Sequence, residues 1–307
     1  MSDERRIQDA PALNLPINDE TGLREAGHYR HTIHDSELAL VENSSVSSFE
    51  PPPSGFESHH QVVLPYFGLF DYRVGSRSAL VDTNCTLFVT PDRDFQDAHP
   101  VEGVGHSAVI INPSMVVLEE LCSSTDSANA FSDIARGSTA RLQLLTHFIL
   151  RTFPSVHDHL LADEWTIAAL KEALGARASN SRRASRVINQ AKMILHDRGC
   201  ERLSLTAIAQ EVGVSGVYLT QEFTRVEGIP LYRYQLLLRL NRALLELPHC
   251  DDITRLALDL GFSSHSHFTS AFRRNFGVTP SAFRLGRLPF GYSRARGGGI
   301  GPPLRTN

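Results

Sequence analysis

An imperfect internal repeat near the C-terminal end of the sequence places the strongest constraint on how this chain folds. The first copy is IAQEVGVSGVYLTQEFTRVEG, residues 208–228, and the second is LALDLGFSSHSHFTSAFRRNFG, residues 256–277. In both copies apolar residues recur at three- and four-residue intervals on either side of a glycine, which is typical of two short helices joined by a tight turn. The matching positions are Ala209, Val212 and Gly213 with Ala257, Leu260 and Gly261, and Leu219, Phe223 and Gly228 with Phe268, Phe272 and Gly277.

The pattern within each copy predicts a helix-turn-helix. A glycine ends the first helix, and a serine begins the next: Ser215 in the first copy, Ser263 or Ser264 in the second. Serine is favoured there because its hydroxyl accepts a hydrogen bond from a free backbone N–H of the first helical turn. The second helix of such a motif lies in the major groove of DNA. Two copies therefore predict two groove-binding helices in one chain.

The segment between the two copies predicts a long connecting helix. Pro230 fits its first turn, and Pro248 ends it. A helix of about 17 residues is a rod of roughly 26 Å. With the flanking turns it would hold the groove-binding helices near 34 Å apart, about one turn of B-DNA. We therefore expect one chain to occupy two successive major grooves on one face of the duplex.

Charge divides the chain into an acidic front and a basic back. Residues 1–180 hold 12 Lys and Arg against 25 Asp and Glu, and residues 181–307 hold 18 against 9, which together give the net charge of −4. Neutralisation of phosphates supplies most non-specific affinity for DNA. A basic half that contains the repeat therefore favours a DNA-binding domain joined to a different, acidic domain, and 307 residues are enough for two domains.

The sequence favours a cytoplasmic location. The four cysteines, Cys85, Cys122, Cys200 and Cys250, are scattered without a CxxC spacing, which favours free thiols in a reducing compartment. Neither a secretory leader nor an apolar run long enough to span a bilayer is found.

The front half predicts antiparallel strands followed by helices. QVVLPYFGLFDYRV, SALVDTNCTLFVTP and HSAVIINP are β-branched and aromatic runs separated by turn residues, as in a small barrel or sandwich. From Ser114 the apolar spacing becomes helical in SMVVLEELC, TARLQLLTHFILRTF and DEWTIAALKEAL. We expect a poorly ordered or extended arm over 1–56, a sensor and dimerisation domain over 57–178, a hinge over 179–184, a DNA-binding domain over 185–288 and a flexible tail over 289–307.

The stretch from Ser185 to Arg284 resembles the DNA-binding domain of AraC/XylS-type transcriptional regulators. The resemblance rests on IAQEVGVS, YLTQEF, EGIPLYRYQLLLRLNRALLEL and ITRLALDLGFSSHSHFTSAFRRNFGVTPSAFR. It implies a two-domain α+β fold: an N-terminal cupin-like β-barrel with covering helices, and an all-α C-terminal domain with two helix-turn-helix motifs joined by a long helix. It also implies double-stranded DNA, a small-molecule effector, RNA polymerase and a second copy of the chain as partners, with transcription activated.

Helical angle predicts which side chains face DNA, since they lie opposite the apolar anchors. Gln pairs with adenine, Arg with guanine, and Thr or Val methyl groups contact the thymine methyl, whereas contacts to phosphate carry no sequence information. The sequence favours Thr220 and Gln221 as base contacts and leaves Arg273 and Arg274 open between bases and phosphates. The full predicted set is Gly216, Val217, Thr220, Gln221, Thr224, Arg225, His265, Ser266, Thr269, Ser270, Arg273 and Arg274.

Metal and enzyme chemistry have little support in the sequence. A cupin-style ligand set of His59, His60, His99 and His106 is conceivable, but adjacent strand residues point to opposite faces. We therefore expect no metal, no cofactor and no catalytic residues; the chain also lacks the usual nucleophile, phosphate-loop and dinucleotide motifs. The alternatives are a metal-dependent cupin-type enzyme, or a ligand-free dimerisation domain, fused to a DNA-binding module.

The helical segments after Ser114 offer a hypothesis for dimerisation. Five apolar residues there either form a subunit interface or simply cover the barrel, and the sequence favours neither. They are Leu142, Leu145, Ile149, Leu170 and Leu174.

Overall fold

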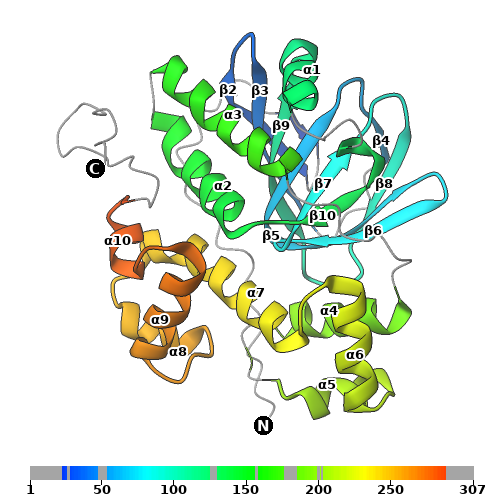
Figure 1. Ribbon diagram of the computed structural model, residues 1–307, viewed down its shortest axis with the longest axis vertical. Coiled ribbons are helices and arrows are strands. Elements are labelled where there is room, and N and C mark those ends of the chain that lie inside the picture. The colour runs from blue at the N-terminus through cyan, green and yellow to red at the C-terminus, as the bar shows by residue number, and fades with distance from the viewer. Residues whose placement is uncertain are drawn as a thin grey trace.

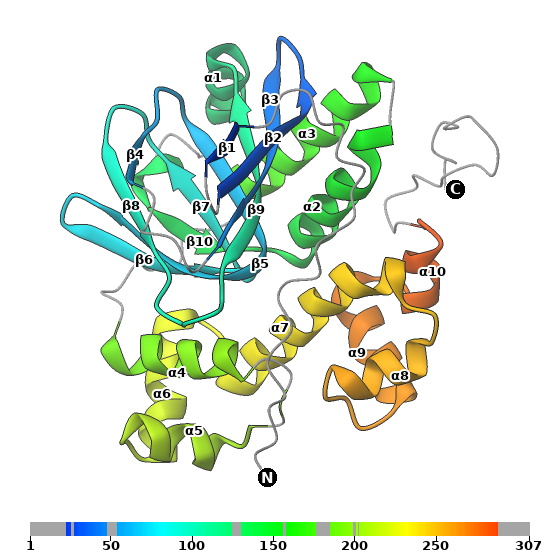
Figure 2. The ribbon, with the colours of Figure 1, turned by 180° about the vertical axis from the view of Figure 1, so that it is seen from behind.

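The computed structural model describes residues 23–25, 28–47, 54–124, 130–155, 158–175, 185–198, 201 and 203–287. The chain forms an antiparallel sheet with helices α1 to α3, here called the N-terminal region, and a group of helices α4 to α10, the C-terminal region. Figures 1 and 2 show the C-terminal helices below the sheet, with α7 running between two smaller groups of helices. No helix among the described residues is long and apolar enough to cross a membrane.

The sheet is organised around its longest strand, β5. One part of β5 pairs with β7 and β9, and the other part pairs with β6 and β8. The change of partners follows an irregularity between Pro65 and Phe67 and then Gly68, whose φ is 79°. A Cβ at Gly68 would lie 1.8 Å from the carbonyl oxygen of Gly105, so only glycine lets the two strands approach there. The strands are β1 (Leu23–Glu25), β2 (His28–Asp35), β3 (Ala39–Val46), β4 (Ser54–Phe56), β5 (Gln61–Val74), β6 (Arg77–Asp82), β7 (Cys85–Val89), β8 (Asp94–Ala98), β9 (His106–Pro113) and β10 (Ala135–Gly137).

The two faces of the sheet hold separate apolar clusters. Alternate residues of β3, β5 and β9 pack against helices on one face, and intervening residues of β5 and β9 belong to a second cluster on the other. In β9, for example, Val109 and Ile111 face the helices, while Ala108 and Ile110 face the second cluster. The antiparallel strands predicted from the runs at 61–74, 78–91 and 106–113 are confirmed.

Strands β2 and β3 correct one expectation. Residues 1–56 were expected to form a poorly ordered or extended arm, but β2 and β3 are full members of the sheet, and β3 lies between β2 and β9. No strand was predicted from the sequence ALVENSSV because it contains few apolar residues. Tertiary contacts compensate: buried Asn43 accepts a hydrogen bond from the hydroxyl of Tyr66 at 2.9 Å, and Val41 is fully buried.

Helices α1 (Met115–Ser124), α2 (Ala140–Thr152) and α3 (His159–Gly175) pack on the sheet, with short 3-10 turns at Ala130–Ser132 and Phe153–Ser155. Thr139 caps α2 by accepting a hydrogen bond from the amide of Leu142. The dimer hypothesis fails for the residues on which it was built, because all of them lie in the helix–sheet core. Leu142, Leu145, Ile149, Leu170 and Leu174 are each no more than 2% exposed.

The C-terminal region contains helices at the places the repeat predicts. Ser215, a predicted N-cap, accepts a backbone hydrogen bond, as do the N-caps Ser204, Asp252 and Thr279, and Ser264 is the cap of the second repeat. The predicted hinge at 179–184 and the tail beyond 288 lie outside the described residues. The helices are α4 (Arg186–Asp197), α5 (Leu205–Val212), α6 (Gly216–Glu227), α7 (Leu231–Glu246), a 3-10 turn (Leu247–His249), α8 (Ile253–Asp259), α9 (His265–Phe276) and α10 (Pro280–Arg284).

Candidate nucleic-acid interface

Two helix pairs with the same local geometry flank α7: α5 with α6, the first helix pair, and α8 with α9, the second helix pair. In the first, Gly213 has a φ of 79°, and the next amide, Val214 N, bonds the carbonyl of Ala209 at 2.9 Å. In the second, Gly261 has a φ of 78°, and Phe262 N bonds the carbonyl of Ala257 at 2.9 Å. The repeat in sequence is therefore a repeat in backbone geometry, with a left-handed glycine turning the chain in each copy.

Each helix pair is anchored from inside by large apolar side chains of its second helix. Leu219 and Phe223 of α6 are fully buried against α4, α5 and the start of α7. Phe268 and Phe272 of α9 are fully buried against α8, α10 and the end of α7. Because these anchors fix the rotation of α6 and α9, the opposite face of each helix is turned outward.

The structure places all twelve predicted DNA-contacting residues on α6 and α9. On α6, Gly216 is half-buried and the other five are exposed. The hydroxyls of Thr220 and Thr224 donate to the carbonyls one turn earlier, at 2.9 and 2.8 Å, which leaves their methyl groups and oxygen lone pairs outward. The α6 members are Gly216, Val217, Thr220, Gln221, Thr224 and Arg225.

On α9 the predicted residues form a more basic outward face. Thr269 is half-buried beside His265, and the others are exposed. The guanidinium groups of Arg273 and Arg274 have neither an ion pair nor a hydrogen bond with any described residue, so both remain available to a ligand. The α9 members are His265, Ser266, Thr269, Ser270, Arg273 and Arg274.

Charge distinguishes the two helix pairs. Between residues 204 and 228 there are three acidic residues and one arginine, whereas between 252 and 277 there are two acidic residues and three arginines. The one arginine of α6, Arg225, is already paired: its Nε donates to Glu222 at 2.7 Å, and a second nitrogen also contacts that carboxylate. The hydrogen bond from Arg225 lowers the pKa of Glu222, so Glu222 stays ionised and cancels the charge of Arg225.

Exposed apolar side chains extend the first helix pair beyond the predicted set. Tyr218 is 46% exposed on α6, Leu205 is 41% exposed at the start of α5, and Tyr232 is 72% exposed at the start of α7. The helical angle of α6 places Tyr218 beside the outward face. No sequence pattern singles out Leu205 or Tyr232, since both belong to apolar runs that predict burial.

The four histidines considered as metal ligands do not converge. His99 and His106 contact each other, Nε2 to Nδ1 at 2.8 Å, whereas His59 bonds Ser58 and His60 packs on Phe131. Among the described residues no group of three or more His, Cys, Asp or Glu side chains is placed to hold a metal ion.

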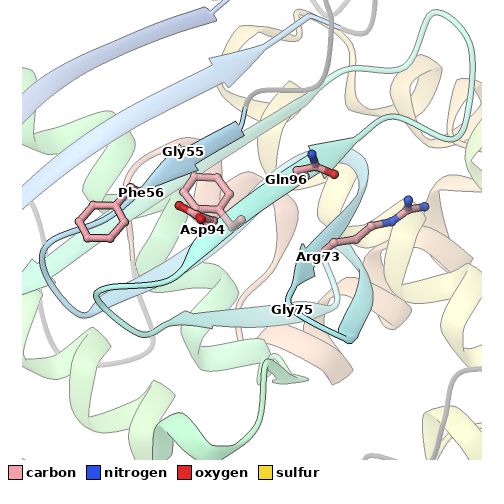
Figure 3. A pocket seen from close by; sticks show the side chains of 7 residues that line it. Gly55, Phe56, Arg73, Gly75, Asp94 and Gln96 are labelled. Atoms are coloured by element: carbon pink, nitrogen blue, oxygen red, sulfur yellow. The ribbon is translucent and has the colours of Figure 1, made fainter.

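A pocket of about 630 Å³ lies in the N-terminal region, on strands β4, β5 and β8 and the turn after β5 (Figure 3). The guanidinium of Arg73, one of its polar groups, is paired with Asp71 at 2.7 Å. Its lining residues, on these three strands and in the turn, are Gly55, Phe56, Arg73, Gly75, Asp94, Phe95 and Gln96.

Comparison with known proteins assigns the C-terminal region to a class. A family profile described as a helix-turn-helix domain matches residues 208–286. The HTH-type transcriptional activator RhaS of Escherichia fergusonii is 37% identical over 94 residues, which are 30% of this chain and 34% of that protein. The Msm operon regulatory protein of Streptococcus mutans is 28% identical over 181 residues, which are 57% of this chain and 62% of that protein. A solved transcriptional regulator from Chromobacterium violaceum, described as containing an AraC-type DNA-binding domain, is 36% identical; the match covers 34% of this chain and 95% of that one, with a TM-score of 0.32.

Residues 208–286 are thus a helix-turn-helix DNA-binding domain. The resemblance to AraC/XylS-type regulators is confirmed for this part of the chain, and the domain belongs to that family. The chain spans about a third of the length of RhaS and less than two thirds of the length of the Msm regulator.

Proposed function

We propose that this chain is a sequence-specific DNA-binding transcription regulator whose two helix pairs are both helix-turn-helix motifs. The observation that carries the proposal is the exposed face shared by α6 and α9: each helix is anchored inward by buried Leu or Phe and presents polar side chains outward. We further propose that the twelve residues on these faces contact DNA, with Gln221 and Thr220 at bases.

The connecting helix supports simultaneous binding by the two motifs. Helix α7 has 16 residues, so it is a rod of about 24 Å. With the turns at its ends, this length suits two recognition helices one turn of B-DNA apart, about 34 Å. A single chain would then cover two successive major grooves.

Selection of duplexes from a random pool by the full chain tests this function. We expect enrichment of a site with two conserved blocks about 10 base pairs apart, centre to centre. Enrichment of one block alone would exclude simultaneous binding. Failure to retain any duplex, even at low salt, would exclude the function itself.

We also propose that the N-terminal region is a cupin-like sensor for a small polar effector. Its second apolar cluster shares one face of the sheet with a polar network, in which Arg30 bonds Glu42 at 2.6 Å and Glu57 at 3.1 Å. Asp97 lies opposite Tyr72 of this cluster, and one of its carboxylate oxygens is buried with no partner among the described residues. Burial, together with Asp71 and Glu57, raises the pKa of Asp97 to about 7. An unpaired buried carboxyl is a suitable contact for a ligand donor.

A thermal-shift screen of the full chain with small polar metabolites tests the sensor. A specific compound should raise the melting temperature, and Asp97→Asn should weaken that rise. If no compound class raises the melting temperature, the sensor role of the region fails. If the rise is equal in Asp97→Asn, the role of Asp97 as a ligand contact fails.

We also propose activation of transcription as the outcome, with RNA polymerase as the contact and a homodimer as the assembly; the relatives' names support the first of these three. RhaS is named an activator, and the matched domain is of the same family. In vitro transcription from a promoter that carries the selected site tests the sign of control. Sedimentation of the full chain at micromolar concentration tests the dimer; a monomer with and without DNA would exclude it.

A further inference from the structure

The turn between β6 and β7 enters the C-terminal region and meets it through charged and polar groups. Asp82, at the end of β6, is fully buried. Its carboxylate accepts hydrogen bonds from the hydroxyl of Tyr234 on α7 and from Nε2 of His196 on α4, the latter at 3.1 Å. The same carboxylate accepts a hydrogen bond of 2.9 Å from the backbone amide of Asn84, which fixes the carboxylate within its own turn. One side chain of the sheet thus joins two helices of the DNA-binding region.

Lys192 of α4 completes this contact. Its ammonium group is buried, donates to the carbonyl of Leu80 on β6 at 3.1 Å, and lies 3.4 Å from Glu227 at the end of α6. Burial alone would lower the pKa of Lys192, but Asp82 and Glu227 reverse this and raise it, so the group stays charged. Lys192 likewise lowers the pKa of Asp82 against the effect of burial. We call Asp82, Lys192, His196, Glu227 and Tyr234 the inter-region polar cluster.

Amide groups extend the same interface along α7 and α2. The Nδ2 of Asn241 donates to the hydroxyl of Thr83 at 3.1 Å, and the Nε2 of Gln143 donates to the carbonyl of Thr83 at 3.0 Å. Three buried amide atoms there have no partner among the described residues: Asn84 Nδ2, Gln143 Oε1 and Asn241 Oδ1. Unpaired buried polar atoms and buried charges make an interface specific in geometry but weak in net stability.

The two helix pairs are attached to the N-terminal region by different kinds of contact. The second pair shares an apolar cluster with α2, which contributes fully buried Leu144, and Arg151 of α2 lies over the ring of Phe283. In the part of the chain that the structure describes, the apolar cluster of the first pair contains no residue of the N-terminal region. Its side of the interface consists of the inter-region polar cluster and of Met193, which packs beside Leu69, Leu80, Val101 and Val104.

The interface leaves both outward faces open. Thr220 and Gln221 on α6, and Arg273 and Arg274 on α9, are exposed. Contact with the N-terminal region therefore does not cover these proposed DNA-contacting residues. The interface instead restrains the position of each helix pair. Helix α7 alone joins the two pairs covalently, and each pair also contacts the N-terminal region.

We propose that Asp82 is a positioning residue for DNA recognition: through Lys192, His196 and Tyr234 it fixes the first helix pair relative to the second, so that α6 and α9 accept half-sites at one spacing. This inference rests on the proposed two-motif DNA binding. Substitution of Asp82 leaves Lys192 buried beside Glu227 alone, which favours release of α4 into water. The second helix pair stays attached through Leu144. The first pair then samples several placements, and selection for spacing falls.

The experiment measures the affinity of the full chain for a series of duplexes whose half-sites are separated by different numbers of base pairs, and for duplexes with one half-site. Wild type should prefer one spacing by about tenfold over spacings changed by half a helical turn, a typical size for coupling between two sites. Asp82→Asn should reduce this preference to about twofold while keeping its affinity for single half-sites. Glu119→Gln on α1, an exposed carboxylate far in sequence from the cluster, is the matched control and should behave as wild type.

Tyr234→Phe is the milder variant, because it removes only the hydroxyl that contacts Asp82 and keeps the buried ring. It should lower the spacing preference by a smaller factor, and it decides the matter if Asp82→Asn does not fold. A wild-type spacing preference in a folded variant would overturn the proposal, and so would an equal loss of affinity for single and paired half-sites. If wild type binds no duplex at all, the proposed function fails instead, so the two failures are distinguishable.

Discussion

The two helix pairs share a backbone and differ in what surrounds it. Both use a left-handed glycine, a serine cap and two buried side chains on the outer helix, yet the first pair is acidic around a self-paired arginine and the second is basic. The first is attached to the rest of the molecule by buried charges, and the second by apolar packing. A duplicated fold therefore does not imply two equal contributions to binding.

This contrast predicts that the two helix pairs contribute differently to DNA binding. The free arginines on α9 are expected to attract phosphates, an attraction that acts on every sequence. Gln221 and the threonine methyl groups on the neutralised face of α6 are expected to discriminate among bases through hydrogen bonds and apolar contact. We expect the second pair to contribute more to affinity and the first more to sequence preference.

The largest expected effect tests whether the two pairs are equally well built. Phe223→Ala and Phe272→Ala each remove a fully buried ring at equivalent positions and should each cost about 3–5 kcal/mol of stability. Chemical denaturation followed by circular dichroism measures this cost, with Tyr232→Ala, at an exposed site, as control. A large cost at only one of the two positions would break the structural equivalence.

The next effect tests the basic face of the second pair. Replacing both Arg273 and Arg274 with Ala should weaken binding to all duplexes alike and reduce the slope of log affinity against log salt by about 2. Arg93→Ala, which removes an exposed charge from the sheet region, is the control for net charge. A loss confined to one base position would instead make these arginines base contacts.

The proposed base contact of the first pair has a different expected outcome. Gln221→Ala should cost about 1–3 kcal/mol on the preferred site and relax selection at one base position. Repeating the selection from a random pool with the variant measures both effects. If the variant loses affinity equally for all sequences, Gln221 contacts the backbone and the division between the pairs is wrong.

A smaller gain is expected when the ion pair on α6 is broken. Glu222→Gln frees Arg225 and removes a negative charge near DNA, so affinity at low salt should rise by about threefold and the rise should fade at high salt. Titration at two salt concentrations measures it. Unchanged affinity would place Arg225 away from the phosphates.

The smallest expected effect arises from the different N-cap residues of α5 and α8. Asp252 caps α8, whereas a neutral serine, Ser204, caps α5. The amides of Thr254 and Arg255 bond the carboxylate of Asp252 and lower its pKa, so its contribution to stability is present above the unfolded value of about 3.9 and is lost as pH falls through the lower folded value. Exchange of α8 amides should therefore accelerate below about pH 4 relative to α5, and Asp252→Asn should remove that difference. Equal acid sensitivity of α5 and α8 would contradict the assignment.

Most of the C-terminal region was predictable because its determinants are local. Caps such as Ser215 and Thr279 act within three residues, and the spacing of Phe268 and Phe272 fixes the inward face of α9. Strands β2 and β3 were missed because polar residues such as Asn43 are buried there by partners distant in sequence, which no local pattern reveals. The sequence predicted helices at α2 and α3 but did not decide whether they cover the sheet or form a subunit interface. The structure shows that they pack on the sheet.

The sequence by itself determined the two helix pairs and the residues on their outer faces, since periodicity and caps operate over a few residues. Only the tertiary structure decided that the leucines of α2 and α3 are core, and that Asp82 meets Lys192 and Tyr234 across more than a hundred residues of chain. The physical reason is that burial and charge pairing depend on which surfaces meet, and the meeting of sheet and helices is set by the whole fold.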